Sequence, residues 1–190
     1  MPANLTKLDR EKEMPDTQWR LNGRCFKFGD DLAHDGAMMP FKYVIERVYD
    51  AAELVPHLFE EVDTSLSAQF KPGDILVAGK NFGKGKPHVQ AYIALRALGV
   101  GVVCESMPFL SYRAAIGRGL LFLTDCTGAS TLVEQGDHLE VDFSTGEFHN
   151  HTQRIERQFP PLPAALKEMV ELGGINGVLQ KWWEANGKAA

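Results

Sequence analysis

Short apolar runs alternate with stretches of helical periodicity in the middle of the chain. Residues 74–78 and 100–104 are two such runs, and residues 120–123 form a third. Between them, residues 88–98 and 108–116 carry apolar side chains at helical spacing, and a glycine follows each stretch. Strand, helix, strand, helix and strand with short connections predict a right-handed parallel βαβαβ unit.

The N-terminal third of the chain is less regular. Residues 1–20 have no apolar period and predict a loose tail, in which Trp19 is the first candidate anchor. Residues 24–28 alternate like a half-buried strand, and a loop rich in turn-forming residues follows over 30–40. Residues 50–70 carry a leucine or valine at every fourth position, which predicts one surface helix packed on a core.

The C-terminal third has antiparallel character. Residues 139–143 alternate strictly and are followed by a second stretch at 147–151, which together predict a hairpin with one face in water. Beyond the prolines at 160–163, we expect a helix that ends at Leu172 and a final helix. We interpret the Trp182–Trp183 pair of that final helix as a core or subunit anchor.

Composition and charge narrow the class of protein. The chain has 190 residues with a formal net charge of −5, so it lacks the overall basic charge typical of nucleic-acid binding. Its apolar runs are far shorter than the roughly 18 residues needed to span a membrane, and its N-terminus does not resemble a secretory signal. We therefore predict a cytoplasmic protein with no nucleic-acid or membrane partner. Because no long linker interrupts the chain, we expect residues 21–190 to form one domain.

The cysteines argue against a metal site held by this chain alone. Cys25, Cys104 and Cys126 are odd in number, widely spaced and without a C-x-x-C pair. This pattern supports neither a disulfide framework nor a self-contained zinc or iron–sulfur site. We interpret the three as buried thiols in a reducing compartment. The prediction is that the chain itself binds no metal.

The turn after the first parallel strand is the candidate for chemistry. Residues 79–85 read Gly-Lys-Asn-Phe-Gly-Lys-Gly, and Lys80, Lys84 and Lys86 bring three positive charges close together. Ligands of parallel sheets collect at the carboxyl ends of strands, where helix N-termini present free N–H groups. The pattern predicts a small pocket for a carboxylate or phosphate, and it is neither a Walker loop nor a dinucleotide fingerprint. A glycine turn with solvated lysines is the alternative interpretation.

These pieces, in their order along the chain, resemble one known family. From about residue 23 to about residue 179, the chain resembles the small subunit of 3-isopropylmalate dehydratase, which is equivalent to the swivelling domain of aconitase. The segments that carry the resemblance are Phe28-Gly29-Asp30-Asp31 with Asp35, Pro40 and Tyr43; Lys71 through Gly83 with Gly85; Tyr112-Arg113, Ala115-Ile116 and Gly119-Leu120; Gly136-Asp137 through Val141-Asp142; Thr145-Gly146-Glu147; and Gly173-Gly174.

The resemblance implies a fold, an activity and a partner. The implied fold is an α/β swivelling β/β/α domain, with a parallel βαβαβ core, helices on one side and an antiparallel layer completed by the hairpin. The implied activity is that of a hydro-lyase or isomerase of leucine-biosynthesis type, acting on a hydroxy di- or tricarboxylate. Its [4Fe-4S] cluster would belong to an aconitase-like large subunit, so this chain would bind no cofactor and be inactive alone. The isolated chain is expected to be able to form a homodimer.

The sequence departs from the family at the segment that carries catalysis. The family has Ser-Ser-Arg-Glu-His after the second glycine of the turn, whereas residues 86–90 here are Lys-Pro-His-Val-Gln. Three hypotheses follow from this difference. Lys86 replaces the serine base and His88 replaces the arginine as a carboxylate contact; or the acid–base groups lie in the large subunit, whose pocket this chain only completes; or catalysis is lost, and the chain is a carboxylate-binding or regulatory partner.

The remaining candidate residues lie in the loops and in the hairpin, and the resemblance implies a substrate contact for some of the loop residues. His34, beside Asp35, is either part of an acid–base pair or switch, or an ordinary polar loop residue. We interpret His149 and His151 as surface residues of the hairpin, since no third ligand lies near them in sequence. Glu46 and Arg47 lie where the family's substrate-selecting loop begins. The implied substrate-binding residues are Asn81, Phe82, Gly83, Lys84, Gly85, Asp35 and Lys42.

Overall fold

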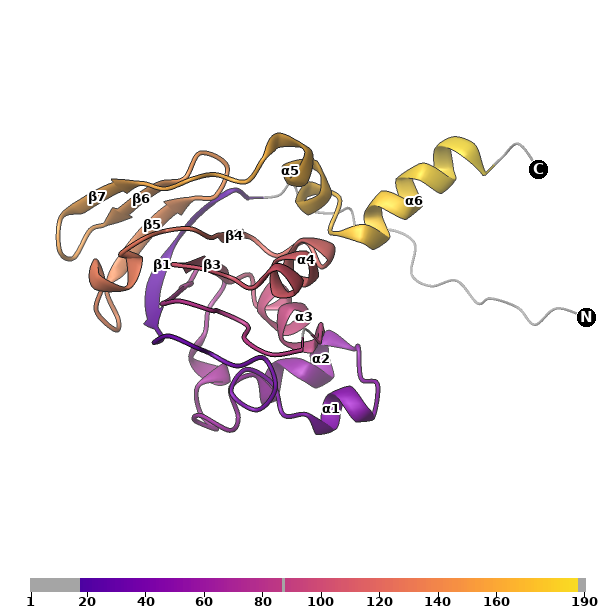
Figure 1. Ribbon diagram of the computed structural model, residues 1–190, viewed down its shortest axis with the longest axis horizontal. Helices are drawn as coiled ribbons and strands as arrows, with labels where there is room; N and C mark the ends of the chain where they lie inside the picture. The colour runs from indigo at the N-terminus through magenta and orange to yellow at the C-terminus, as the bar shows by residue number, and fades with distance from the viewer. Residues whose placement is uncertain (1–17, 87, 188–190) are drawn as a thin grey trace, which may run out of the picture.

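A seven-stranded mixed sheet forms the centre of the computed structural model, which describes residues 18–86 and 88–187 (Figure 1). The tail predicted for residues 1–20 lies outside the described residues, apart from its last three. The spatial order of the strands is β4-β3-β2-β1-β5-β6-β7. Their bounds are β1 (Arg20–Lys27), β2 (Ile75–Ala78), β3 (Gly101–Cys104), β4 (Phe122–Leu123), β5 (His138–Asp142), β6 (Glu147–Asn150) and β7 (Ile155–Gln158).

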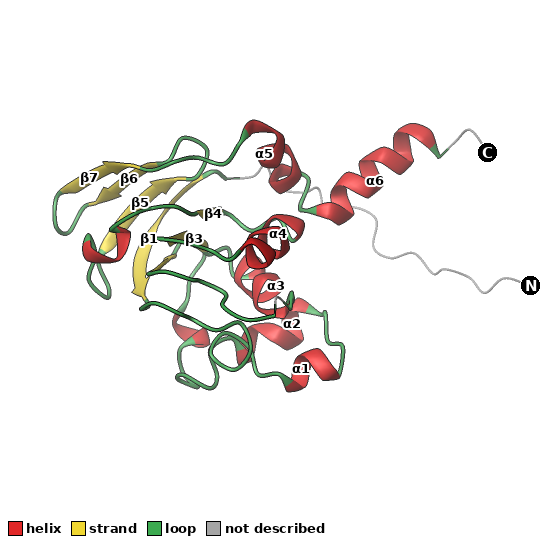
Figure 2. Ribbon diagram, viewed as in Figure 1, coloured by secondary structure: helices red, strands yellow, loops and turns green. Residues whose placement is uncertain are grey.

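The predicted βαβαβ unit is confirmed. β2 pairs in parallel with β3, and β3 pairs in parallel with β4. The connections are α3 (Gln90–Ala97) and α4 (Phe109–Gly117), which lie on the same side of the sheet in Figure 2. Every residue of β2 and β3 is buried, because both faces of these strands are covered, and this explains why they are continuous apolar runs.

β1 joins the parallel and antiparallel halves of the sheet. Its residues 25–27 pair in parallel with β2, and its residues 20–24 pair antiparallel with β5. The predicted hairpin is present as β5 and β6, which pair antiparallel. β7, a third antiparallel strand that the sequence pattern did not predict, follows at the edge, where its burial is too low to produce apolar alternation.

Two apolar clusters cover the opposite faces of the parallel strands. Leu76 and Ala78 of β2 belong to the cluster beneath the helices. The alternate residues Ile75 and Val77 belong to the second cluster, together with Phe148 and other residues of the antiparallel strands. The antiparallel half therefore covers the face that the helices leave free, which confirms the predicted division into a helical side and an antiparallel layer.

The single helix predicted for residues 50–70 is wrong. Residues 50–70 form instead α2 (Ala51–Leu54) and two 3₁₀ turns, η1 (Val55–His57) and η2 (Ser67–Gln69), and α1 (Lys42–Ile45) precedes them. Pro56 cannot donate a helical hydrogen bond, and Phe59 has a φ of +63°. The Asp63 carboxylate accepts a hydrogen bond from the Ser65 N–H at 2.8 Å, which is a local turn that competes with helix.

The two C-terminal helices are confirmed as α5 (Ala164–Glu171) and α6 (Ile175–Asn186), and α6 extends away from the sheet in Figure 1. Trp182 and Trp183 are 58% and 65% exposed, so they are not core residues, and their role as a subunit anchor stays a prediction. Trp19 is half-buried and packs against both apolar clusters, as expected of an anchor. In the part of the chain that the structure describes, no helix has the length and apolar character to cross a membrane.

Candidate functional site

The glycine turn (residues 79–85) follows the carboxyl end of β2 and is held by the opening loop (residues 30–40). Backbone hydrogen bonds join the two segments. The Gly83 N–H donates to the Leu32 carbonyl at 2.9 Å, and the His34 N–H donates to the Lys84 carbonyl at 2.9 Å. The Asp30 carboxylate also accepts from the Lys80 N–H at 2.7 Å. The two segments, about 50 residues apart in sequence, therefore form one unit.

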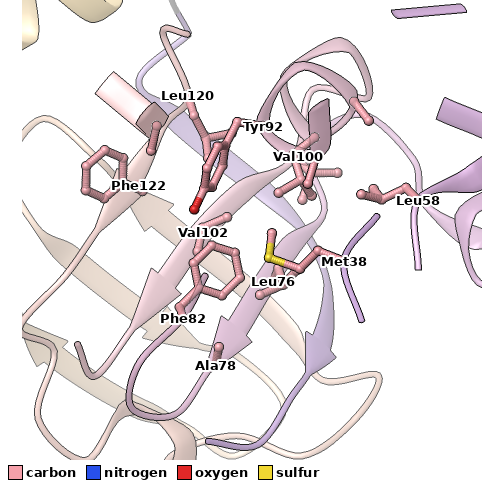
Figure 3. Close-up of a cluster of buried hydrophobic side chains, with 14 of the residues drawn as sticks. Met38, Leu58, Leu76, Ala78, Phe82, Tyr92, Val100, Val102, Leu120 and Phe122 are labelled. Carbon is pink, nitrogen blue, oxygen red and sulfur yellow. The ribbon is translucent and has the colours of Figure 1, made fainter. Parts of the chain in front are cut away.

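The interior of the turn is tightly packed. Phe82 is fully buried in the helix-side cluster, near Tyr92 of α3 (Figure 3). Gly83 has a φ of +76°, and a Cβ atom there would lie 2.8 Å from Ser111 Oγ and would also collide with the Tyr92 hydroxyl. Only glycine fits this position without displacing buried atoms.

Most N–H groups of the turn are occupied by the protein itself. The Asn81 N–H donates to Ser106 Oγ at 2.9 Å, the Phe82 N–H to the Ser106 carbonyl at 3.0 Å, and the Gly83 and Lys84 N–H groups to the Leu32 carbonyl. The Gly85 N–H has no hydrogen-bond partner among the described residues, and the Val89 side chain does not cap α3. The free donors near the turn are therefore the Gly85 N–H and the N–H groups of the first turn of α3.

The Asp35 cluster, made of His34, Asp35 and His88, lies beside the turn. Asp35 Oδ1 is 2.6 Å from His88 Nδ1 and 3.4 Å from His34 Nδ1. The His34 side chain is fully buried, whereas those of His88 and Asp35 are 24% and 34% exposed. Burial lowers the pKa of His34 to about 4, against the smaller opposing effect of Asp35, so this imidazole is neutral near pH 7.

The Asp35 cluster is the one group in the described part of the chain whose His, Cys, Asp or Glu ligand atoms gather as a metal site would need, within 4.8 Å of one another. The distance of 2.6 Å between Asp35 Oδ1 and His88 Nδ1 is that of a hydrogen bond, with a proton between the two atoms. Two ligands on a tetrahedral zinc ion, each about 2.0–2.1 Å from it, lie about 3.3 Å apart. The geometry therefore favours a shared proton over a shared metal ion.

The candidate cations differ in their surroundings. Lys84 Nζ is 3.3 Å from Asp31 Oδ1, and Lys42 Nζ is 3.4 Å from Glu60 Oε1 and lies over the Tyr43 ring. Lys86 is exposed and forms no hydrogen bond or ion pair with a described residue. The structure thus brings Asp35 and His88 together and places Lys84 and Lys86 at the rim of the turn, whereas Lys42 pairs elsewhere.

Sequence reasoning missed the burial of His34. It lies among loop residues of mixed polarity, and nothing in its neighbours along the chain indicates a buried side chain. The contacts of its ring come from distant segments, with the Tyr92 and His88 rings 5.2 Å and 5.9 Å away between centroids. The ring is buried by the pairing of the opening loop with the turn, and no pattern along the sequence indicates that pairing.

Comparison with known proteins agrees with this architecture. No family model matches the chain. The 3-isopropylmalate dehydratase small subunit 1 of Archaeoglobus fulgidus is 38% identical over 154 residues, which cover 80% of this chain and 92% of that protein. The isopropylmalate/citramalate isomerase small subunit of Methanocaldococcus jannaschii is 36% identical over 162 residues, covering 85% and 94%.

A solved structure gives the same result. The crystal structure of a 3-isopropylmalate dehydratase from Methanocaldococcus jannaschii superposes with a TM-score of 0.79 at 30% identity, over 90% of this chain and 99% of that one. The similarity in sequence and the similarity in fold therefore both extend over most of the chain. The chain belongs to the family of 3-isopropylmalate dehydratase small subunits, which are hydro-lyase subunits that act with a large subunit.

Proposed function

We propose that this chain covers a hydroxy di- or tricarboxylate bound to the large subunit and holds its carboxylates at the glycine turn. Two relatives are named for isopropylmalate and citramalate, which are hydroxy dicarboxylates. The observation that carries the proposal is the group of exposed cations, Lys84 and Lys86, at the carboxyl end of β2. Cations beside free N–H groups are the donors that carboxylates require.

The proposal assigns different tasks to the turn residues. Asn81, Phe82 and Gly83 shape the turn, because their N–H groups are already used within the protein. Lys84, Gly85 and Lys86 contact a substrate carboxylate, together with the uncapped N-terminus of α3, and Lys84 exchanges Asp31 for the substrate to do so. Lys42 assists only if its ammonium leaves Glu60 when the large subunit docks.

We further propose that the iron–sulfur cluster belongs entirely to the large subunit. Clusters of this kind are held by cysteine thiolates. All three cysteines of this chain are fully buried, and burial raises the pKa of Cys25 and of Cys104 to about 12. A buried, protonated thiol does not fit a ligand at a subunit surface, which supports a cluster supplied by the partner.

The test is reconstitution with an aconitase-like large subunit under anaerobic conditions. Dehydration of a panel of hydroxy acids is followed by the ultraviolet absorbance of the new double bond, and each subunit alone should give no signal. Lys84→Ala with Lys86→Ala should raise KM at least about tenfold, as expected when charged hydrogen bonds are lost. Lys71→Ala, an exposed lysine at the opposite end of β2, is the matched control. Absence of turnover across the panel with an intact cluster would contradict the proposal.

A further inference from the structure

We propose that His88 is the general base that replaces the family's missing serine hydroxyl, with Asp35 as its positioning residue. This inference rests on the proposed function and deepens it. It assigns the imidazole a different task from that of an arginine-like carboxylate contact. It also separates two tasks on neighbouring residues, since Lys86 binds a carboxylate and His88 moves a proton.

The hydrogen bond to Asp35 selects one tautomer of His88. A carboxylate accepts hydrogen bonds, so the 2.6 Å contact places the proton of the neutral ring on Nδ1. The lone pair then lies on Nε2. No described residue donates a hydrogen bond to this nitrogen, and the side chain is 24% exposed. An imidazole oriented by a carboxylate, with its other nitrogen open to a ligand, is the arrangement of a general base.

His34 is the second imidazole beside the Asp35 carboxylate. Its fully buried ring is neutral near pH 7, so it adds no charge beside Asp35, and its Nδ1 lies 3.4 Å from the same oxygen, Oδ1. The Phe41 ring lies 5.5 Å from the His88 ring between centroids and covers part of it. The titratable groups that contact His88 among the described residues are Asp35 and His34, both from the opening loop.

Lys86 lacks the features of an oriented base. Its side chain is exposed, and no described residue bonds to it. A general base must be held within hydrogen-bond reach of the proton that it removes. His88 is held in this way by a residue 53 positions away in the chain, whereas Lys86 depends on its own flexible side chain.

The proposed step balances as a dehydration. His88 Nε2 takes the proton from the carbon next to a substrate carboxylate, and the electron pair of that C–H bond becomes the C=C double bond. The hydroxyl on the adjacent carbon departs and leaves as water with a proton supplied from the large-subunit side. His88 then returns its proton to solvent, or to the carbon when water is added back.

The decisive experiment uses the reconstituted pair of subunits and its pH–rate profile. His88→Gln should lower kcat by at least about 100-fold with KM changed by less than about threefold, as expected for loss of a base. Imidazole in solution should restore part of the activity of His88→Gly. Asp35→Asn should lower kcat across the whole pH–rate profile, its acidic limb included, and leave KM within about threefold of the wild-type value, because the imidazole loses the carboxylate that orients it. Lys86→Ala should raise KM and leave the acidic limb in place.

Each outcome decides between the hypotheses. If the wild-type pair shows no turnover, the proposed function fails. If the wild-type pair is active and His88→Gln matches it, or if imidazole does not rescue His88→Gly, the base assignment is overturned and the proposed function stands. Loss of kcat and of the acidic limb in Lys86→Ala would make Lys86 the base instead. Each variant that is folded should co-purify with the large subunit. If His88→Gln does not co-purify, the rescue of His88→Gly by imidazole tests the base assignment in its place.

Discussion

Two groups of histidines on this chain both lie beside carboxylates, but they differ in burial and in the other partners of those carboxylates. In the Asp35 cluster, a carboxylate lies 2.6 Å from one imidazole and beside a second that is fully buried. The sheet histidines, His138, His149 and His151, lie on β5, β6 and the turn that follows β6. The centroid of the His151 ring is 5.5 Å from that of His138 and 6.1 Å from that of His149. His149 and His151 are 30% and 48% exposed.

The carboxylates beside the two groups also differ. Glu140 is 3.3 Å from His151, but the Arg20 guanidinium holds it at 2.7 Å and keeps the pKa of this carboxyl below its usual range. Asp35 has only imidazoles as side-chain partners within the described ranges 18–86 and 88–187. A carboxylate already paired with an arginine adds little to an imidazole, whereas one without a cation can orient it. A histidine beside a carboxylate is therefore not by itself a functional site.

The largest expected effect comes from the packing that fixes the Asp35 cluster. Gly83→Ala should destabilise the protein by about 3 kcal/mol or more, because the new methyl group collides with Tyr92 and Ser111 and the backbone has a φ of +76°. Urea unfolding of the isolated chain measures the loss. Gly85→Ala, with a φ of +107° and open space around the added atom, should cost only the backbone strain of about 1–2 kcal/mol. Equal losses in both variants would show that packing behind the turn is unimportant.

That glycine turn is visible in the sequence, whereas the Asp35 cluster is not. Glycines, lysines and a preceding apolar run are local signals, so the amino-acid pattern alone singles out residues 79–85. The parallel unit is predictable for the same reason, since each of its elements carries its own periodicity. The region 50–70 shows that such spacing alone does not specify a helix, since Leu54 and Leu58 are fully buried without one continuous helix, whereas Val62 is 54% exposed.

The Asp35 cluster depends on a pairing that no local pattern encodes. Asp35 and His88 meet because the opening loop crosses the glycine turn through hydrogen bonds such as His34 N–H to Lys84 O at 2.9 Å. β7 was missed for a different reason, since an exposed edge strand does not need apolar alternation. The Asp35 cluster was missed because it depends on a tertiary contact, and β7 was missed because it is exposed.

The next effect is the pH dependence of stability that His34 contributes. Its pKa is about 4 in the folded protein and close to 6.5 when unfolded, so the unfolded chain binds a proton that the folded chain does not. This contribution is fully present above pH 6.5 and is lost as the pH falls toward 4, by about 3 kcal/mol. Urea unfolding of the wild type between pH 7 and pH 4 should show this loss.

His34→Gln sharpens the same comparison. The variant should be less stable than the wild type at pH 7, because a buried polar side chain loses its fitted surroundings, and its stability should fall less steeply between pH 6.5 and pH 4. His138→Gln, at an exposed position on β5, is the control and should keep the slope of the wild type. A variant at position 34 with an unchanged slope would mean that the buried ring does not cause the acid sensitivity.

The smallest effect is expected at the sheet histidines. His151→Gln should change stability by no more than about 0.5 kcal/mol, because the ring is 48% exposed and its partner Glu140 keeps Arg20. The kcat of the reconstituted pair should also stay at the wild-type value, in contrast to the loss expected for His88→Gln. Both substitutions remove an imidazole beside a carboxylate, so the ratio of their kcat values isolates what position contributes to chemistry. A ratio near one would mean that the Asp35 cluster is no more special than the histidines on the sheet.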